Sequence, residues 1–527
     1  MNRVKESLLR KKTLYTICFI FLGMIDFVRH TQQESWWGPI VNCTGILLMV
    51  IVLSKYKPKD LLCRFSWVWT GISVIMLISV VLWRDEHIFG IYRWTAFTAV
   101  LNIWLIGILA YRTMKNVFVE KSVQIKWNAV IIFAIAMVFF MMLSPYHAVW
   151  PLWFLSIFGL FYLTHFNKAD FGDLREAMAD GTIVVFLILQ IYAYGYRPFD
   201  VDRYMGAFSN SNMTALHYLV TYTAVLFKLH FLTVKEGTKK WKMVFFVLAA
   251  GLLDFQLLTM TRTAWIVSAV ITVLFGLLVV RRLWKKNRKA VLGRGIALGL
   301  CTLLLFPGVF ATVRWLPAMW HHPVWYAGEW AEYKVHSFDP ADSEKYTDFD
   351  EFMAGILKRL GIAGIIHNPL VLKAQAAGNA EYQKVPLSGP ENLTTSLRIR
   401  FTIYKAYLNE LNWTGHGKQE GHYIITDTKP KLHTFVWHPQ NVWIQVAYYY
   451  GIPAGILFFL LSVLILRKQI DIIAKNREDK YAFIPLFISI IFMMYGFTEL
   501  VWTIGQFILF LFLFVQHPQF GMAGEEK

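Results

Sequence analysis

Cysteine is scarce in this sequence: there are four among 527 residues, and the stretch from residue 314 to 441 has none. A disulfide framework or a thiolate metal site is therefore excluded. Charged residues are also few, since they make up 16% of the chain, against about 25% in soluble globular proteins. The hydrophobic share is 56%, and the mean hydropathy is +0.45. This composition excludes a soluble, a disordered and a disulfide-stapled secreted protein, and it indicates a polytopic membrane protein.

Apolar runs of membrane-spanning length fill most of the chain. A helix needs about 20 apolar residues to cross the hydrocarbon core, because lipid cannot satisfy exposed backbone groups. On that criterion we predict an all-α polytopic membrane protein with about 14 transmembrane helices. The predicted spans are 13–29, 37–54, 64–83, 89–111, 127–144, 147–164, 181–196, 212–232, 243–259, 263–280, 296–313, 442–466, 482–498 and 502–517.

These spans divide the chain into three parts. Residues 1–313 hold transmembrane helices 1–11, residues 314–441 form one long external loop, and residues 442–527 hold helices 12–14 and a cytoplasmic tail. Cytoplasmic loops of membrane proteins are rich in lysine and arginine. With the amino terminus inside, the cytoplasmic loops hold 33 of the 52 lysines and arginines, and the short external loops hold six. We therefore expect a multi-pass protein with both termini in the cytoplasm.

The long external loop has no net charge, because it carries 13 basic and 13 acidic residues. The formal net charge of +18 therefore comes from the cytoplasmic loops, which face anionic lipid. This removes the main argument for a nucleic-acid partner. A connection of about 128 residues is normally a functional element rather than a simple linker. Its pattern predicts that it is partly helical, with helices near Phe349–Leu360 and over Ser396–Leu411.

Several short motifs follow one another between residues 206 and 455. They are Gly206-Ala-Phe-Ser-Asn-Ser-Asn212, Met260-Thr-Arg262, Ser396-x-Arg398-x-Arg400-x-x-x-Tyr404, Gly415-His416-Gly417, and Asn441-Val-Trp-Ile-Gln445 followed by Gly451-Ile-Pro-Ala-Gly455. In this order the motifs resemble those of the bacterial O-antigen ligase and O-antigen polymerase superfamily. Its members are multi-span glycosyltransferases that act outside the cytoplasmic membrane. The similarity covers roughly residues 200–515.

The resemblance implies a function in building the bacterial cell envelope from the cytoplasmic membrane. The donor would be a glycan on a polyprenyl diphosphate, and the acceptor a sugar hydroxyl on a glycan or glycolipid. Polymerase and ligase share the donor site and differ in the acceptor, so the sequence leaves both open. The motif positions imply catalytic roles for His438 and Arg400. They imply substrate binding by Arg262, Arg398, Asn441, His416 and Asn212.

The chemistry itself favours these residue types. Departure of a lipid diphosphate develops negative charge, and arginine is permanently charged and binds phosphate through two parallel hydrogen bonds. Arg398 and Arg400 diverge by about 200° on a helix, so we expect one of them at the site and choose Arg400 for its spacing to Tyr404. No acidic cluster accompanies these arginines, and we expect transfer without a metal or other cofactor.

Activation of the acceptor hydroxyl needs a base that titrates near neutrality, which histidine supplies. The family's histidine directly precedes its asparagine, whereas here that position is Gln440. His438 is therefore the predicted base, with His433 and His416 as alternatives. A different class also stays open: a transporter that flips a lipid-linked oligosaccharide.

Overall fold

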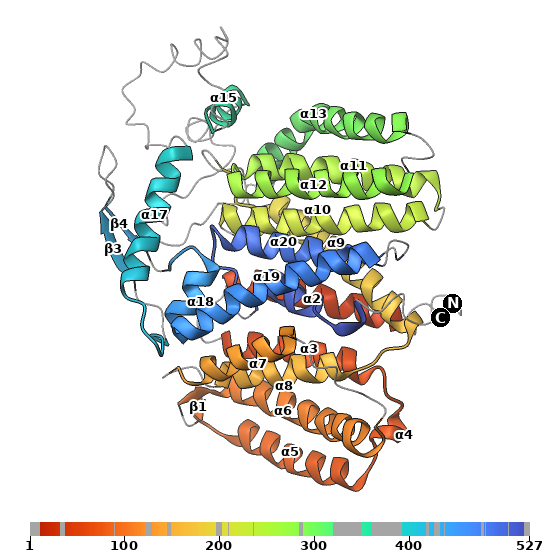
Figure 1. Ribbon diagram of the computed structural model, residues 1–527, viewed down its shortest axis with the longest axis vertical. Coiled ribbons are helices and arrows are strands. Elements are labelled where there is room, and N and C mark those ends of the chain that lie inside the picture. The colour runs from red at the N-terminus through yellow and green to blue at the C-terminus, as the bar shows by residue number, and fades with distance from the viewer. Residues whose placement is uncertain are drawn as a thin grey trace. The chain divides into compact units, whose positions relative to one another are not determined.

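The protein is almost entirely α-helical. The computed structural model describes residues 11–31, 37–88, 90–121, 129–144, 149–196, 203–208, 210–234, 237–283, 288–319, 349–359, 393–417, 421–425, 433–436, 438–475, 479, 481–503 and 505–520. These residues form eighteen α-helices and two short antiparallel hairpins, which the all-α prediction missed (Figure 1). The chain divides into two compact units.

The first unit contains residues 1–185, 410–419 and 441–527. Its helices are α2 (Lys11–Thr31), α3 (Trp37–Leu53), α4 (Pro58–Leu61), α5 (Arg64–Leu82), α6 (Arg93–Met114), α7 (Ala129–Met142), α8 (Val149–Leu163), the first part of α9 (Lys168–Tyr196), α18 (Val442–Tyr450), α19 (Ile452–Lys475), α20 (Ile484–Gly496) and α21 (Phe507–Phe514). The hairpin of β1 (His87–Ile88) and β2 (Ile91–Tyr92) joins α5 to α6. Aromatic contacts between distant segments hold this unit, as where Phe514 packs on Phe19 and Phe161 with ring centroids 5.1 and 5.0 Å apart.

The second unit contains residues 186–409 and 420–440. It holds the end of α9, the 3-10 turn Gly206–Phe208, α10 (Ser211–Val234), α11 (Lys239–Leu258), α12 (Arg262–Leu283), α13 (Arg288–Met319), α15 (Phe349–Arg359), α17 (Leu393–Asn409), β3 (His422–Ile425) and β4 (His433–Val436). β3 and β4 pair antiparallel, with His422 opposite Val436 and Ile425 opposite His433. The two helices predicted inside the long loop correspond to α15 and α17.

Six of the described helical stretches are long and apolar enough to cross a membrane. They are Arg64–Leu82, Arg93–Val119, Lys168–Gly195, Ser211–Val234, Lys239–Leu258 and Gly293–Val313. Shorter apolar helices cover Gly38–Leu53, Ala129–Met142, Pro151–Leu163, Arg262–Leu278 and Ile484–Gly496. Length and composition thus indicate an α-helical membrane protein, and the count of fourteen spans stays a prediction.

The predicted span 442–466 is not one helix, because the chain breaks between α18 and α19 at Gly451. This glycine has φ +95°, a conformation that residues with a Cβ rarely adopt. A Cβ there would lie 2.1 Å from the carbonyl oxygen of Trp413. The turn Asn412–Gly417 packs against the break, and the N–H groups of His416 and Gly417 donate to the carbonyls of Tyr448 and Tyr449 at 2.8 and 3.0 Å. The break therefore satisfies the last carbonyls of α18 from outside the helix.

The break predicts that Gly451→Ala destabilises the protein. The substitution forces a Cβ into the turn at a strained φ, which costs about 1–3 kcal/mol. The control is Gly276→Ala in α12, where nothing lies within 4 Å of the added Cβ. Removing this helical glycine should be neutral or stabilise by up to about 1 kcal/mol. Thermal unfolding of the two purified variants in detergent checks this, and equal melting temperatures would contradict it.

Candidate functional site

Three arginines meet at the turn Thr259–Thr261, which joins α11 to α12. Arg203 donates from Nε to the carbonyl of Thr259 at 3.0 Å and from Nη2 to Oγ1 of Thr261 at 2.9 Å. Arg359, the last residue of α15, donates from Nη1 to the carbonyl of Met260 at 3.2 Å. Arg262 begins α12 and lies close enough to Arg359 for the two cations to repel each other. We call Thr259–Thr261 with these three side chains the arginine turn.

The segment before α10 positions Arg203. Gly206 has φ +54°, and a Cβ there would lie 2.6 Å from Cγ2 of Thr214, so the tight turn Gly206–Phe208 requires glycine. Oδ1 of Asn210 accepts from the backbone N–H of Asn212 at 2.9 Å and caps the start of α10. Oδ1 of Asn212 in turn accepts from Nη2 of Arg203 at 2.7 Å and from Oγ1 of Thr261 at 3.2 Å. Asn212 thus links α10 to the arginine turn.

Helix α15 positions Arg359. Phe352 and Ile356 form its buried face, and the ring of Phe352 stacks on Phe306 of α13 with the centroids 5.9 Å apart. A Cβ at Gly355 would lie 3.0 Å from Cε of Met260, so the helix passes close to the turn. Met260 has φ +50°, which is uncommon for a residue with a side chain. The amphipathic pattern of α15 therefore brings a cation from the long loop to the end of α11.

A second group forms where α17 packs on the chain that leads to His438. The hydroxyl of Tyr407 donates to the carbonyl of Val436 at 3.1 Å, and that of Tyr404 donates to the carbonyl of Gln440 at 3.4 Å. Tyr407 is fully buried and meets the ring of His422 edge-on at 4.6 Å. On this helix Arg400 is half-buried and acts electrostatically on His438, whereas Arg398 is exposed.

The environment of His438 makes its ring neutral. Burial, and secondarily the positive charge of Arg400, lowers the pKa of His438 to about 4. The backbone N–H of Gln440 donates to Nδ1 of His438 at 3.3 Å, and Gln440 has φ +49°. Because Nδ1 accepts this hydrogen bond, the proton of the neutral ring lies on Nε2. Nδ1, the nitrogen of His438 that could take up a proton, therefore already accepts a hydrogen bond.

Two further predicted residues, Asn441 and His416, have identifiable structural contacts in the first unit. Asn441 caps α18, where its Oδ1 accepts from the N–H groups of Trp443 and Ile444, both at 3.1 Å. His416 lies on the turn Asn412–Gly417, and its ring stacks on Tyr448 with the centroids 4.2 Å apart. Its Nε2 lies 2.7 Å from the carbonyl oxygen of Glu410. The side chain of His433 lies outside the described residues. Both Asn441 and His416 thus serve local structure, whatever else they do.

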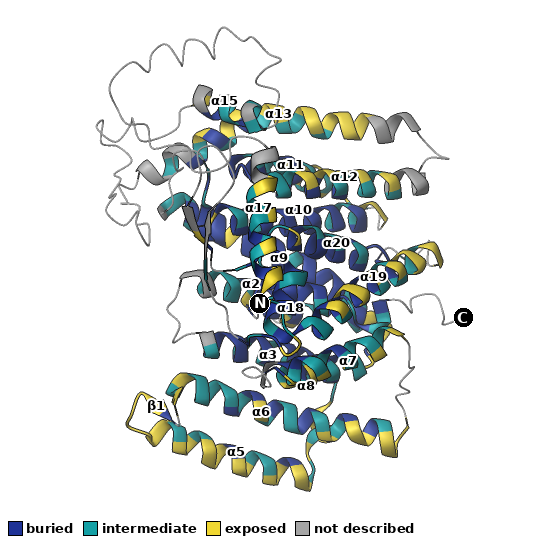
Figure 2. Cartoon of the chain, turned by 60° about the vertical axis from the view of Figure 1, so that its left-hand side comes forward, coloured by how far each residue is buried: buried dark blue, intermediate teal, exposed yellow. Residues whose placement is uncertain are grey.

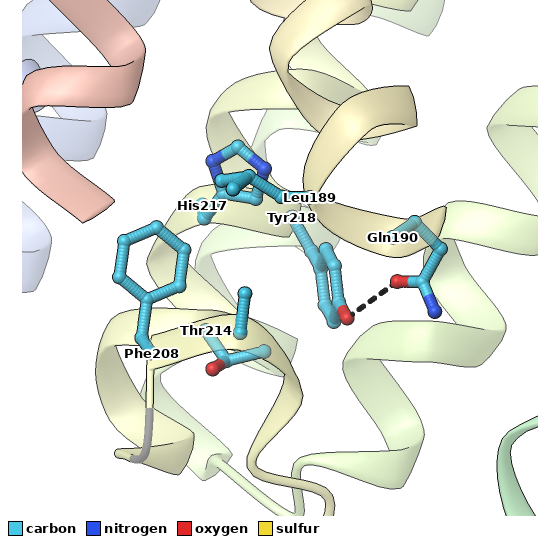
Figure 3. A pocket seen from close by; sticks show the side chains of 7 residues that line it. Leu189, Gln190, Phe208, Thr214, His217 and Tyr218 are labelled. Atoms are coloured by element: carbon cyan, nitrogen blue, oxygen red, sulfur yellow. Dashed lines mark hydrogen bonds between the residues drawn. The ribbon is translucent and has the colours of Figure 1, made fainter. Parts of the chain in front are cut away.

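A small void in the second unit lies beside the start of α10. Leu189, Gln190, Ala207, Phe208, Thr214, His217 and Tyr218 line it, and it has no room for a water molecule (Figure 3). The hydroxyl of Tyr218 donates to Oε1 of Gln190 at 2.8 Å. This region is a packed core of mixed apolar and polar side chains. It supports the segment that carries Arg203.

Sequence reasoning missed Arg203 and Arg359. Arg203 lies three residues before Gly206 and is one of the six basic residues of the predicted short external loops. Arg359 lies at the end of the helix predicted near Phe349–Leu360, but the sequence pattern does not reveal its partner, the carbonyl of Met260. Both bind carbonyls of a turn that is distant in sequence. No group of three or more histidine, cysteine, aspartate or glutamate side chains that could hold a metal occurs among the described residues.

Comparison of the chain with protein-family models, with curated proteins and with solved structures finds no match.

The arginine turn predicts energetic coupling between Arg203 and Asn212. A hydrogen bond from a guanidinium to a partly buried amide oxygen contributes about 1–3 kcal/mol, so Arg203→Ala and Asn212→Ala should destabilise the protein less than additively by that amount. Chemical denaturation of both single variants and the double variant in detergent measures the coupling. Arg294 is exposed and lies near the start of α13, so Arg294→Ala is the control and its effect should be additive with that of Asn212→Ala. Additive effects for Arg203 and Asn212 would show that their contact has no energetic weight.

Proposed function

We propose that this chain is a bacterial membrane glycosyltransferase. It transfers a polyprenyl-diphosphate-linked glycan to a sugar hydroxyl outside the cytoplasmic membrane, as a glycan polymerase or ligase. The arginine turn carries the proposal, because it gathers three guanidinium groups around three residues of backbone. Repulsion among these cations is relieved by a bound anion, and the guanidinium fork matches phosphate oxygens. The motif resemblance supports the same donor.

The reaction divides into a leaving-group side and an acceptor side. The acceptor oxygen attacks the anomeric carbon, the bond from that carbon to the phosphate oxygen breaks, and its electron pair goes to the leaving diphosphate. Arg262, Arg203 and Arg359 would neutralise the charge that develops there, together with the N–H groups at the start of α12. Arg400 is assigned to the same charge by the motif resemblance. The proton of the acceptor hydroxyl goes to a base.

His438 is the proposed base, but its pKa of about 4 lies below the near-neutral value expected from the sequence. Its geometry sets a further condition on this role. Only Nδ1 can take a proton, so the ring must give up the hydrogen bond from the N–H of Gln440 when it acts. The alternative is that Nε2–H of His438 donates a hydrogen bond to a diphosphate oxygen. The two roles differ in their dependence on pH.

A transporter of lipid-linked oligosaccharide is the second candidate, favoured by one observation. Asp254 of α11 is 0% exposed, and neither of its carboxylate oxygens has a hydrogen-bond partner in the part of the chain that the structure describes. Buried ionisable residues in membrane helices often belong to ion or proton pathways. Asp254 therefore separates the two candidates experimentally.

The proposed function predicts that Arg400→Lys slows glycan transfer severely. Lysine keeps the charge but loses the planar fork, and a loss of about 3 kcal/mol of transition-state stabilisation is roughly a hundredfold in rate. The assay uses protein reconstituted with a polyprenyl-diphosphate-linked oligosaccharide and follows the product glycans. Arg294→Lys, an exposed arginine in a predicted cytoplasmic loop, is the matched control and should retain activity. If the wild type transfers no glycan but moves the lipid across the bilayer, and Asp254→Asn stops that movement, the transporter is correct.

A base role for His438 predicts an unusual pH profile. A base must be neutral to take a proton, and with a pKa of about 4 this imidazole is neutral from about pH 5 upward. The rate should therefore stay level from about pH 7 down to about pH 5, where an ordinary histidine base would lose most of its activity. His438→Ala should slow transfer across this whole range. Full activity in His438→Ala together with loss of transfer in His416→Ala would instead move the base to His416.

A further inference from the structure

Helix α17 presents an apolar stripe to its surroundings. Leu397, Phe401 and Leu408 are 43%, 64% and 49% exposed, and their spacing of four and seven residues aligns them along one line of the helix. The opposite side carries Ile403 and Tyr407, which are buried at 2% and 0% exposure. Figure 2 shows exposed residues along the length of α17. The helix thus has one face packed on its own unit and one apolar face turned outward.

Exposed basic residues flank the stripe. Arg398 and Lys405 are both exposed and lie roughly a quarter of a turn from the apolar line. Phenylalanine and leucine on one side with lysine and arginine beside them are typical of helices that lie in the surface of an anionic bilayer. The stripe of α17 has this charge complementarity to lipid headgroups, which a purely apolar protein interface does not require.

The direction of α17 agrees with such a position. Figure 1 shows α17 running across the direction of α10, α11 and α12, within the same unit. α10 and α11 are among the helices long and apolar enough to span a membrane. A helix that runs across spanning helices lies along the plane of the bilayer.

We propose that α17 is an interfacial helix that binds the surface of the bilayer. Leu397, Phe401 and Leu408 enter the boundary between headgroups and acyl chains, and Arg398 and Lys405 contact the phosphates of anionic lipids. Helices of this kind bury their apolar face about 5–10 Å into that boundary. Arg398 is then a lipid contact, which differs from the donor-binding role that its motif implies. The inference does not rest on the proposed glycosyltransferase activity.

Photo-crosslinking of the full-length protein tests the occupant of the stripe. A benzophenone amino acid replaces Phe401 in one sample and Asn409 in the other, since Asn409 is also exposed on α17 but lies off the apolar line. The protein is placed in nanodiscs of phosphatidylethanolamine and phosphatidylglycerol without any polyprenyl lipid, irradiated, and analysed by mass spectrometry. We expect a phospholipid adduct at position 401 with at least about fivefold higher yield than at position 409.

Each other outcome contradicts the proposal. A crosslinked dimer would make the stripe an interface between two copies of the chain. An adduct that forms only after polyprenyl diphosphate is added would make it a site for the donor tail, and equal yields at 401 and 409 would show non-specific contact. Size-exclusion chromatography before irradiation verifies that both samples are folded and monodisperse.

The basic flank has its own test. In the sample labelled at position 401, replacing phosphatidylglycerol by phosphatidylcholine should lower the adduct yield about threefold or more, because the attraction to anionic lipid is lost. Arg398→Gln with Lys405→Gln should remove the dependence on phosphatidylglycerol while the apolar contact remains. A yield that ignores both lipid charge and these substitutions would contradict the role assigned to Arg398 and Lys405.

Discussion

The backbone carbonyls at the ends of helices are the constraint on which this structure depends. The last carbonyls of a helix have no partner within it, and an apolar surrounding supplies none. At several helix ends, donors from distant parts of the chain supply these hydrogen bonds. At the end of α8, Nε2 of His517 lies 3.1 and 3.0 Å from the carbonyl oxygens of Phe161 and Thr164. At the end of α18, the turn Asn412–Gly417 supplies backbone N–H groups. At the end of α11, arginines do so.

The third of these solutions connects stability with chemistry. A guanidinium has five N–H donors, and one or two of them suffice for the carbonyls of Thr259 and Met260. Arg203 donates from Nε and Nη2 to Thr259, Thr261 and Asn212, and Arg359 donates from Nη1 to Met260. The hydrogen bonds that hold the turn therefore also fix the positions of two cations. The negative end of the α11 dipole lies at these carbonyls, which favours cations there even without a ligand. In the proposed function, these cations, which the fold requires at the turn, also face the leaving diphosphate.

The sequence was sufficient for the parts of the fold that follow from local pattern. Hydrophobic runs predicted where the apolar helices lie, and the amphipathic period predicted α15 and α17 within the long loop. The break at Gly451 was not predicted, because it depends on the carbonyl of Trp413, which the periodicity of residues 442–466 does not report. Arg203 and Arg359 were missed for the same reason, since each acts on backbone far along the chain. The lowered pKa of His438 likewise comes from burial and from a neighbouring helix. The motifs predicted Asn212 and Asn441 as site residues. Their clearest contacts cap or link helices, so part of the motif pattern reflects local structure.

The discontinuous first unit has a consequence for biogenesis. Its early part, residues 1–185, is synthesised before residues 441–527, and the whole of the second unit is made in between. Until the ribosome reaches Phe514, the faces of Phe19 and Phe161 lack the ring on which they pack. The hydroxyl of Tyr162 donates to the carbonyl of Leu513 at 2.7 Å, and this hydrogen bond likewise cannot form until residue 513 has been synthesised. The nascent chain therefore carries an incomplete helical unit through most of translation, and its exposed aromatic faces are covered only when the last segment of the chain has been made.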